Sequence, residues 1–207
     1  MSHYLELGDY RRCVASNYAA LREARPDLPG AAAQFRTRRD ELFASHSQSA
    51  LDEAQKAQFK GLDYYPYDPI YRFVLPVHTD IEPQSREIML PHDGQLRLER
   101  FGRVDFVVES QPVSLYVYWI AAYGGGIFLP FRDLTNQTDT YGGGRYVLDT
   151  IKHADLGQQS DELVIDFNFA YNPSCAYNAR WVCPLSPPEN RLRVAIRAGE
   201  KRFADAL

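Results

Sequence analysis

Hydrophobic side chains recur at helical spacing in the first 61 residues of the chain and alternate with polar ones after that. A first helix is predicted over residues 9–24, where larger side chains recur at intervals of four, four and three residues. These side chains are Tyr10, Val14, Tyr18 and Leu21. A second, surface helix with a thin apolar stripe is predicted over residues 31–44, and a third, short helix before Gly61.

Short runs of alternating hydrophobic and polar residues fill the chain from residue 62 onward. Nine strands are predicted, at residues 71–77, 86–90, 96–101, 104–108, 115–121, 127–131, 145–151, 163–169 and 192–196. Because no helical pattern separates these runs, we expect the strands to pair antiparallel. The predicted fold class is mainly β: an antiparallel sandwich or partly closed barrel of about nine short strands, preceded by two or three N-terminal helices.

Two details of the pattern describe individual strands and turns. The run 115–121 is apolar on both faces, which is typical of the centre of a sheet, and Pro130 indicates an edge or a β-bulge. Tyr-Gly-Gly-Gly occurs at 123–126 and again at 141–144, before a strand each time. Both runs lack the G-x-G-x-x-G spacing, so tight turns with positive φ are favoured over phosphate binding.

The composition is that of one folded domain, because 207 residues with 45% hydrophobic and 24% charged side chains can bury one core. We expect a helical lead at residues 1–61 to pack on the same core as the β domain at 62–207. The formal net charge of -4 provides no positive field, so no nucleic-acid partner is expected. The longest apolar run, 115–123, is far shorter than the roughly 20 residues of a membrane-spanning helix. No membrane partner is therefore expected.

The N-terminal residues lack the apolar stretch of a secretory signal, so a cytoplasmic location is expected.

The sequence contains few features that indicate a cofactor or a metal. No cofactor is predicted, and the oligomeric state stays open. The five histidines include no pair at the i, i+4 spacing of a helical zinc motif. Cys175 and Cys183, with seven residues between them, also lack the Cys-x-x-Cys spacing. Buried structural thiols, a local thiol pair or disulfide, and a metal-binding or nucleophilic cysteine are three interpretations of this pair.

The C-terminal third concentrates polar groups next to aromatic ones. In the predicted strand 163–169 the odd positions are apolar, so Asp166 and Asn168 are expected to project together from the other face. The loop at 170–191 that follows is rich in amides, aromatics and prolines. A small polar or anionic molecule could bind where this loop covers the strands, because a guanidinium group suits carboxylate and phosphate. The predicted ligand-binding residues are Arg145, Asp166, Asn168, Tyr171, Asn172, Tyr177 and Asn190.

Arg145 is the expected anion clamp of such a site, and Asp166 is its orienting group or general base. Cys175 is a candidate nucleophile, so catalysis is conceivable beside binding. The alternative is a non-catalytic interaction or scaffold module, in which the same polar side chains tie down the loop by hydrogen bonds to the backbone. An exposed aromatic patch would then contact a partner. Its residues are Tyr64, Tyr65 and Tyr67.

Six segments carry a resemblance to a known family. They are FKGLDYYPYDPIYR (59–72), FLPFRDLT (128–135), TYGGGRY (140–146), DFNFAYNPSCAYN (166–178), CPLSPPENRL (183–192) and AGE (198–200). In wording and order they resemble the bacterial and archaeal family named domain of unknown function 1684, over about residues 35–203. The resemblance implies one family domain with an N-terminal helical lead, and it implies no particular activity, cofactor or catalytic residue.

Overall fold

The computed structural model describes residues 3–24, 27–90, 94–121 and 123–204. In these residues the helices are α1 (His3–Glu23), α2 (Leu28–Ser45) and α3 (Glu53–Gln58). The strands are β1 (Arg72–Pro76), β2 (Gln84–Leu90), β3 (Gly94–Val108), β4 (Gln111–Ala121), β5 (Gly126–Phe131), β6 (Arg145–Asp149), β7 (Gln158–Gln159) and β8 (Glu162–Asp166). The 3₁₀ helices are η1 (Pro69–Tyr71), η2 (Thr150–Lys152), η3 (Phe167–Phe169), η4 (Ser174–Ala176) and η5 (Pro188–Asn190).

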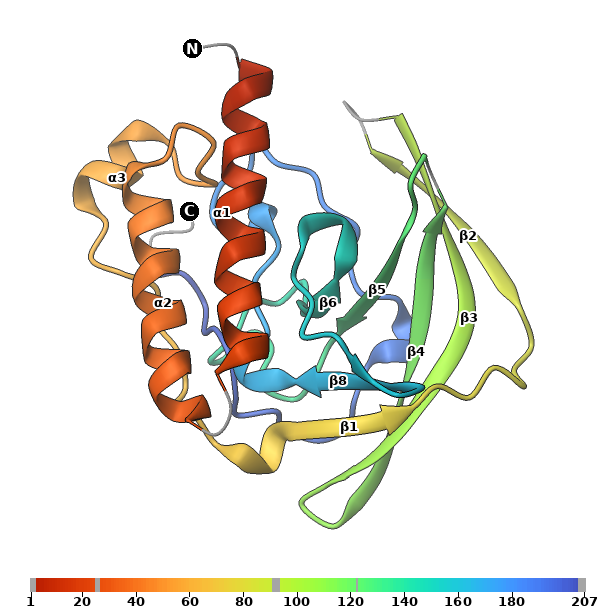
Figure 1. Ribbon diagram of the computed structural model, residues 1–207. Coiled ribbons are helices and arrows are strands. Elements are labelled where there is room, and N and C mark those ends of the chain that lie inside the picture. The colour runs from red at the N-terminus through yellow and green to blue at the C-terminus, as the bar shows by residue number, and fades with distance from the viewer. Residues whose placement is uncertain (1–2, 25–26, 91–93, 122, 205–207) are drawn as a thin grey trace.

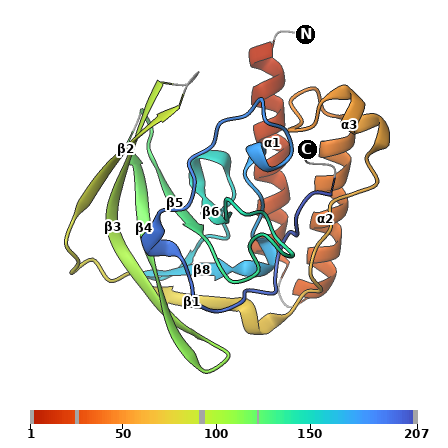
Figure 2. The same ribbon diagram turned by 180° about the vertical axis from the view of Figure 1, so that it is seen from behind.

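The strands form two antiparallel sheets, ordered β2-β3-β4-β5-β6 and β1-β8-β7. The five-stranded sheet is curved and lies on the opposite side of the molecule from α1 and α2 (Figure 1). The view from behind gives the same arrangement, with β8 and the edge strand β6 of the large sheet between the helices and strands β2, β3 and β4 (Figure 2). The predicted mainly β, antiparallel fold is confirmed, in a sandwich-like form rather than a closed barrel.

Eight strands occur in the described residues, where nine were predicted. The runs 96–101 and 104–108 belong to one strand, β3, whose register shifts between Arg100 and Gly102. This bulge accounts for the break in the hydrophobic alternation. The central position predicted for 115–121 is confirmed, because β4 is third of the five strands. A register shift in β5 also confirms the predicted bulge at Pro130.

The strand predicted over 192–196 is wrong, and the two-residue strand β7 was not predicted. Leu192 donates its backbone N–H to the carbonyl of Arg132 (2.8 Å), and Leu134 donates to the carbonyl of Val194 (3.0 Å). The segment is therefore extended beside residues 132–134 without forming a ladder. The alternation that predicted a strand reflects burial against the core: Leu192, Val194 and Ile196 are all buried.

The N-terminal helices pack through aromatic rings against η3 and the loops next to it. Tyr18 and Leu21 of α1 are buried, as the predicted stripe requires. The ring of Phe35 in α2 lies edge-on to Tyr18 at 5.1 Å and to Phe169 of η3 at 5.2 Å between centroids. Phe35 is thus fully covered, and α2 is more buried than the sequence predicts. None of the helices in the described residues is long and apolar enough to cross a lipid bilayer.

Candidate functional site

Arg145, the predicted anion clamp, has its guanidinium group bound to the protein itself. Its side chain is 0% exposed and forms an ion pair with Asp133 at 2.8 Å. The same group donates to the carbonyl oxygens of Ile196 (2.9 Å), Glu200 (3.2 Å) and Ala198. Arg145 therefore fixes the C-terminal segment against β6, and these donors are not directed toward a ligand.

Tyr177 and Asn172 surround a carboxylate that the sequence analysis did not single out. Both side chains donate hydrogen bonds to Glu200, Asn172 at 3.0 Å. Arg39 of α2 completes the cluster with an ion pair to Glu200 at 3.0 Å, and its guanidinium lies 5.4 Å from the ring centre of Tyr171. Burial raises the pKa of both Tyr171 and Tyr177, so these phenols stay neutral.

The side chain of Asn190 also forms hydrogen bonds with backbone atoms. It closes η5 and is completely buried. Its amide nitrogen donates to the carbonyls of Tyr116 (2.9 Å) and Pro130 (2.8 Å), and its oxygen accepts from the N–H of Tyr116 (2.8 Å). Asn190 thereby joins the C-terminal loop to β4 and β5.

Asp166 and Asn168 lie together, but for a different reason from the predicted one. The strand predicted over 163–169 ends at Asp166, whose carboxylate accepts hydrogen bonds from the backbone N–H (3.0 Å) and the side chain (2.8 Å) of Asn168. This local cap starts η3, and both side chains are buried. The amide of Asn168 also pairs with the backbone of Asp68, donating at 2.7 Å and accepting at 2.9 Å.

The second carboxylate oxygen of Asp166 is held less tightly. The Tyr67 hydroxyl donates to it at 3.4 Å, and Nε of Arg72 forms an ion pair with it at 3.8 Å. Arg72 and Asp166 are directly opposite each other in the register of β1 and β8. Burial raises the pKa of Asp166, and the hydrogen bonds from Asn168 oppose that rise.

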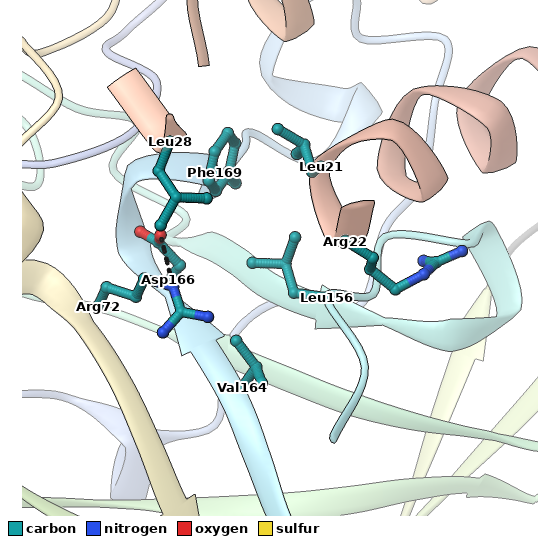
Figure 3. A pocket seen from close by; sticks show the side chains of 8 residues that line it. All are labelled: Leu21, Arg22, Leu28, Arg72, Leu156, Val164, Asp166 and Phe169. Carbon is teal, nitrogen blue, oxygen red and sulfur yellow. Dashed lines mark ion pairs between the residues drawn. The ribbon is translucent and has the colours of Figure 1, made fainter. Parts of the chain in front are cut away.

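A pocket opens beside this ion pair, between the end of α1, the start of α2 and the outer face of β1 and β8 (Figure 3). Its enclosed space of about 20 Å³ holds roughly one water-sized group. The guanidinium of Arg72 extends from Asp166 toward the apolar wall at Leu156 and Val164 (Figure 3). The lining residues are Leu21, Arg22, Leu28, Arg72, Leu156, Val164, Asp166 and Phe169.

Asp166 alone among the predicted site residues lines this pocket. Sequence reasoning missed Arg72, although it closes the conspicuous segment 59–72. Arg22 was also missed, because the sequence of α1 indicates only an amphipathic helix. The side chain of Arg22 donates to the carbonyl of Asp155 at 2.7 Å and forms the far wall of the pocket.

Two further expectations concern thiols and surface aromatics. Cys175 and Cys183 are free and half-buried, with the backbone N–H of Cys175 donating to the sulfur of Cys183 at 3.4 Å. Within the described ranges, no three His, Cys, Asp or Glu side chains gather as a metal site. The predicted exposed patch is wrong, because Tyr65 is only 8% exposed and donates to Asp139 at 2.8 Å. Tyr64 and Tyr67 are half-buried.

Comparison with known families places these features in context. Residues 57–201 match the family described as Protein of unknown function (DUF1684). The chain belongs to this family. The DUF1684 segment contains Asp166, Arg72 and Glu200, whereas α1 and α2, with Arg22 and Arg39, precede it. The family domain therefore supplies the strand side of the pocket, and the N-terminal helices supply the other wall.

A solved relative shares the fold. It is an uncharacterized protein of Haloarcula marismortui, determined by solution NMR, with 32% sequence identity and a TM-score of 0.63. The alignment covers 88% of this chain and 98% of the archaeal one. No curated protein matches the chain. The comparisons thus establish DUF1684 membership and a shared fold.

Proposed function

We propose that this DUF1684 domain binds the anionic group of a small molecule in the pocket beside Arg72 and Asp166. The observation that supports it most is the state of the Arg72 guanidinium. Its Nε faces Asp166, while its two terminal nitrogens have no hydrogen-bond partner in the described part of the chain. The side chain is still only 18% exposed. A half-buried guanidinium with spare donors is suited to a carboxylate or phosphate.

Each group in the pocket has a distinct role in this proposal. Arg72 takes the clamping role that the sequence analysis gave to Arg145. Asp166 keeps its predicted role of orienter, because its ion pair holds one edge of the Arg72 guanidinium and leaves the other edge free. Arg22 lines the far wall, and its guanidinium, which donates to the carbonyl of Asp155, adds a more distant positive charge. The apolar side chains around them exclude water and strengthen these interactions.

The size of the pocket limits what the ligand can be. An enclosed space of about 20 Å³ accepts roughly one water-sized group, such as part of a carboxylate. The remainder of the ligand must lie outside, over the ends of α1 and α2. We therefore favour recognition of a terminal carboxylate or phosphate over enclosure of a whole molecule.

The scaffold alternative draws support from other residues. The side chains of Arg145, Asn172 and Asn190 all bind backbone atoms of distant segments. In that case the polar side chains of the C-terminal loop are structural, and the ion pair of Arg72 and Asp166 only joins β1 to β8. The two functions differ in one measurable property, which is anion binding at Arg72.

An NMR titration with acetate and with inorganic phosphate tests the proposal. We expect amide shifts at residues lining the pocket in the full chain. Arg72→Gln should weaken the affinity about tenfold, equivalent to about 1.4 kcal/mol, and Arg22→Gln should weaken it less. Arg11→Gln is the matched control, because Arg11 lies exposed on the same helix as Arg22 and does not line the pocket.

The melting temperature of each variant shows whether it is folded. Equal loss of affinity in Arg11→Gln and Arg72→Gln would indicate general charge attraction, and would contradict a site. The scaffold alternative would be favoured if the amide shifts of the wild-type chain were confined to regions outside the pocket. It would also be favoured if the wild-type chain showed no shifts while Arg72→Gln remained folded.

A further inference from the structure

Cys175 and Cys183 are brought together by the C-terminal loop. The backbone N–H of Cys175 donates to the sulfur of Cys183 at 3.4 Å, and the thiol of Cys175 also bonds to that sulfur. The hydroxyl of Tyr141 lies 3.7 Å from the sulfur of Cys175. Both thiols are half-buried, so each is accessible to a small reagent. The two sulfurs are thus neighbours, and solvent reaches both.

The loop is anchored between the two cysteines and again directly after Cys183. Between the cysteines, the Trp181 indole donates to the carbonyl of Ala50 at 2.9 Å, and the Arg180 guanidinium donates to the carbonyls of Ser49 (3.1 Å) and Leu51 (3.0 Å). After Cys183, the carbonyl of Pro184 accepts from the hydroxyl of Tyr146 in β6. The thiols are therefore held in position by the fold rather than meeting by chance in a mobile loop.

The two thiols differ in acidity. The hydrogen bond from Cys175 lowers the pKa of Cys183 to about 6, against its own desolvation, and the positive charge of Lys152 adds to the effect. The same contact raises the pKa of Cys175, whose thiol is the donor. The neighbouring phenols of Tyr141 and Tyr146 stay neutral because burial raises the pKa of each. Cys183 is consequently the thiolate of the pair.

We propose that Cys183 and Cys175 form a redox-active dithiol that reacts with hydrogen peroxide and closes to a disulfide. The Cys183 thiolate attacks one peroxide oxygen, so that an S–O bond forms, the O–O bond breaks and hydroxide leaves to become water. Cys175 then attacks the sulfenic sulfur, so that an S–S bond forms, the S–O bond breaks and a second water leaves. Two thiols supply the two electrons that peroxide accepts, and a low-molecular-weight dithiol reverses the reaction.

Trapping chemistry with single-cysteine variants tests this assignment. In a Cys13→Ser chain, dilute peroxide should remove both remaining thiols, with a mass loss of two hydrogens that dithiothreitol reverses. In Cys175→Ser the sulfenic acid at residue 183 has no partner, so dimedone should label it. Cys183→Ser should be labelled at least tenfold more slowly. In the wild-type chain, Cys13 is exposed on α1 and provides an internal reference for an ordinary thiol.

Either of two results would overturn the proposal. One is that residues 175 and 183 remain thiols at a peroxide dose that oxidises Cys13. The other is that Cys175→Ser and Cys183→Ser take up dimedone at the same rate. Near-identical melting temperatures of the two variants exclude unfolding as the cause of a difference, and anion binding at Arg72 is not involved in either readout.

Discussion

Arg39 and Glu200 form an ion pair with an N–O distance of 3.0 Å, although their side chains are only 12% and 1% exposed. The pair joins the N-terminal helix α2 to the end of the segment that defines the family. Removing two charges from water costs several kcal/mol, which only good geometry and further hydrogen bonds offset. Tyr177 and Asn172 supply those hydrogen bonds to Glu200.

Glu200→Gln should strongly destabilise the fold. The substitution keeps the shape of the side chain but leaves the Arg39 guanidinium buried without a counter-charge. We expect the free energy of unfolding to fall by about 3 kcal/mol, as for other broken buried pairs. Urea denaturation followed by tryptophan fluorescence measures the change.

The adjacent surface pair provides a matched control. Lys201 and Asp63 lie 3.2 Å apart, but their side chains are 31% and 67% exposed. Asp63→Asn should therefore cost less than about 1 kcal/mol, because solvent screens exposed pairs. Equal losses in Asp63→Asn and Glu200→Gln would mean that the buried cluster contributes no more than a surface contact.

Asp166→Asn should change how stability depends on pH. Because burial raises the pKa of Asp166, the folded chain binds this proton more tightly than the unfolded chain. Its contribution to stability is thus full below the unfolded pKa of about 3.9, and is lost as pH rises through the raised folded pKa. The stability of the wild type relative to Asp166→Asn should therefore fall as pH increases across this window.

Melting temperatures of both chains at closely spaced pH values from about 4 to 7 measure this difference. A wild-type advantage that grows with pH would show the opposite linkage. In that case the ion pair with Arg72 would outweigh the burial of Asp166, and the carboxylate would be held in its charged form.

The fold could largely be predicted from sequence because its signals are local. Alternation identified most strands, the doubly apolar run identified the centre of the large sheet, and Pro130 identified a bulge. The failures have physical reasons. An alternating segment such as 192–196 can bury one side against the core without pairing, and periodicity does not distinguish the two cases. Two strands were predicted where the structure has the single strand β3, because a bulge interrupts the alternating pattern.

The candidate site was harder to predict, because its contacts are not local. The sequence shows that Arg145 is a cation beside polar groups, but its partners are Asp133 and three carbonyl oxygens, those of residues 196, 198 and 200, and carbonyl oxygens carry no side-chain signature. Asp166 and Asn168 lie together because they are only two positions apart in the chain, and either a strand or a turn achieves this. The pairing of Arg72 with Asp166 depends on β1 meeting β8, and that partner choice is a property of the whole topology.

The two Tyr-Gly-Gly-Gly runs predict a contrast between two glycines. Gly144 has φ of +94°, and an added Cβ would lie 2.6 Å from the carbonyl oxygen of Phe131. Gly124 has φ of +87° but has no atom within 4 Å of the same position. Gly124→Ala should therefore cost about 1 kcal/mol from backbone strain alone, whereas Gly144→Ala should cost about 3 kcal/mol, because it adds overpacking. Urea denaturation of both variants checks the order, and equal losses would mean that backbone conformation, not the close approach to Phe131, requires glycine in the second run.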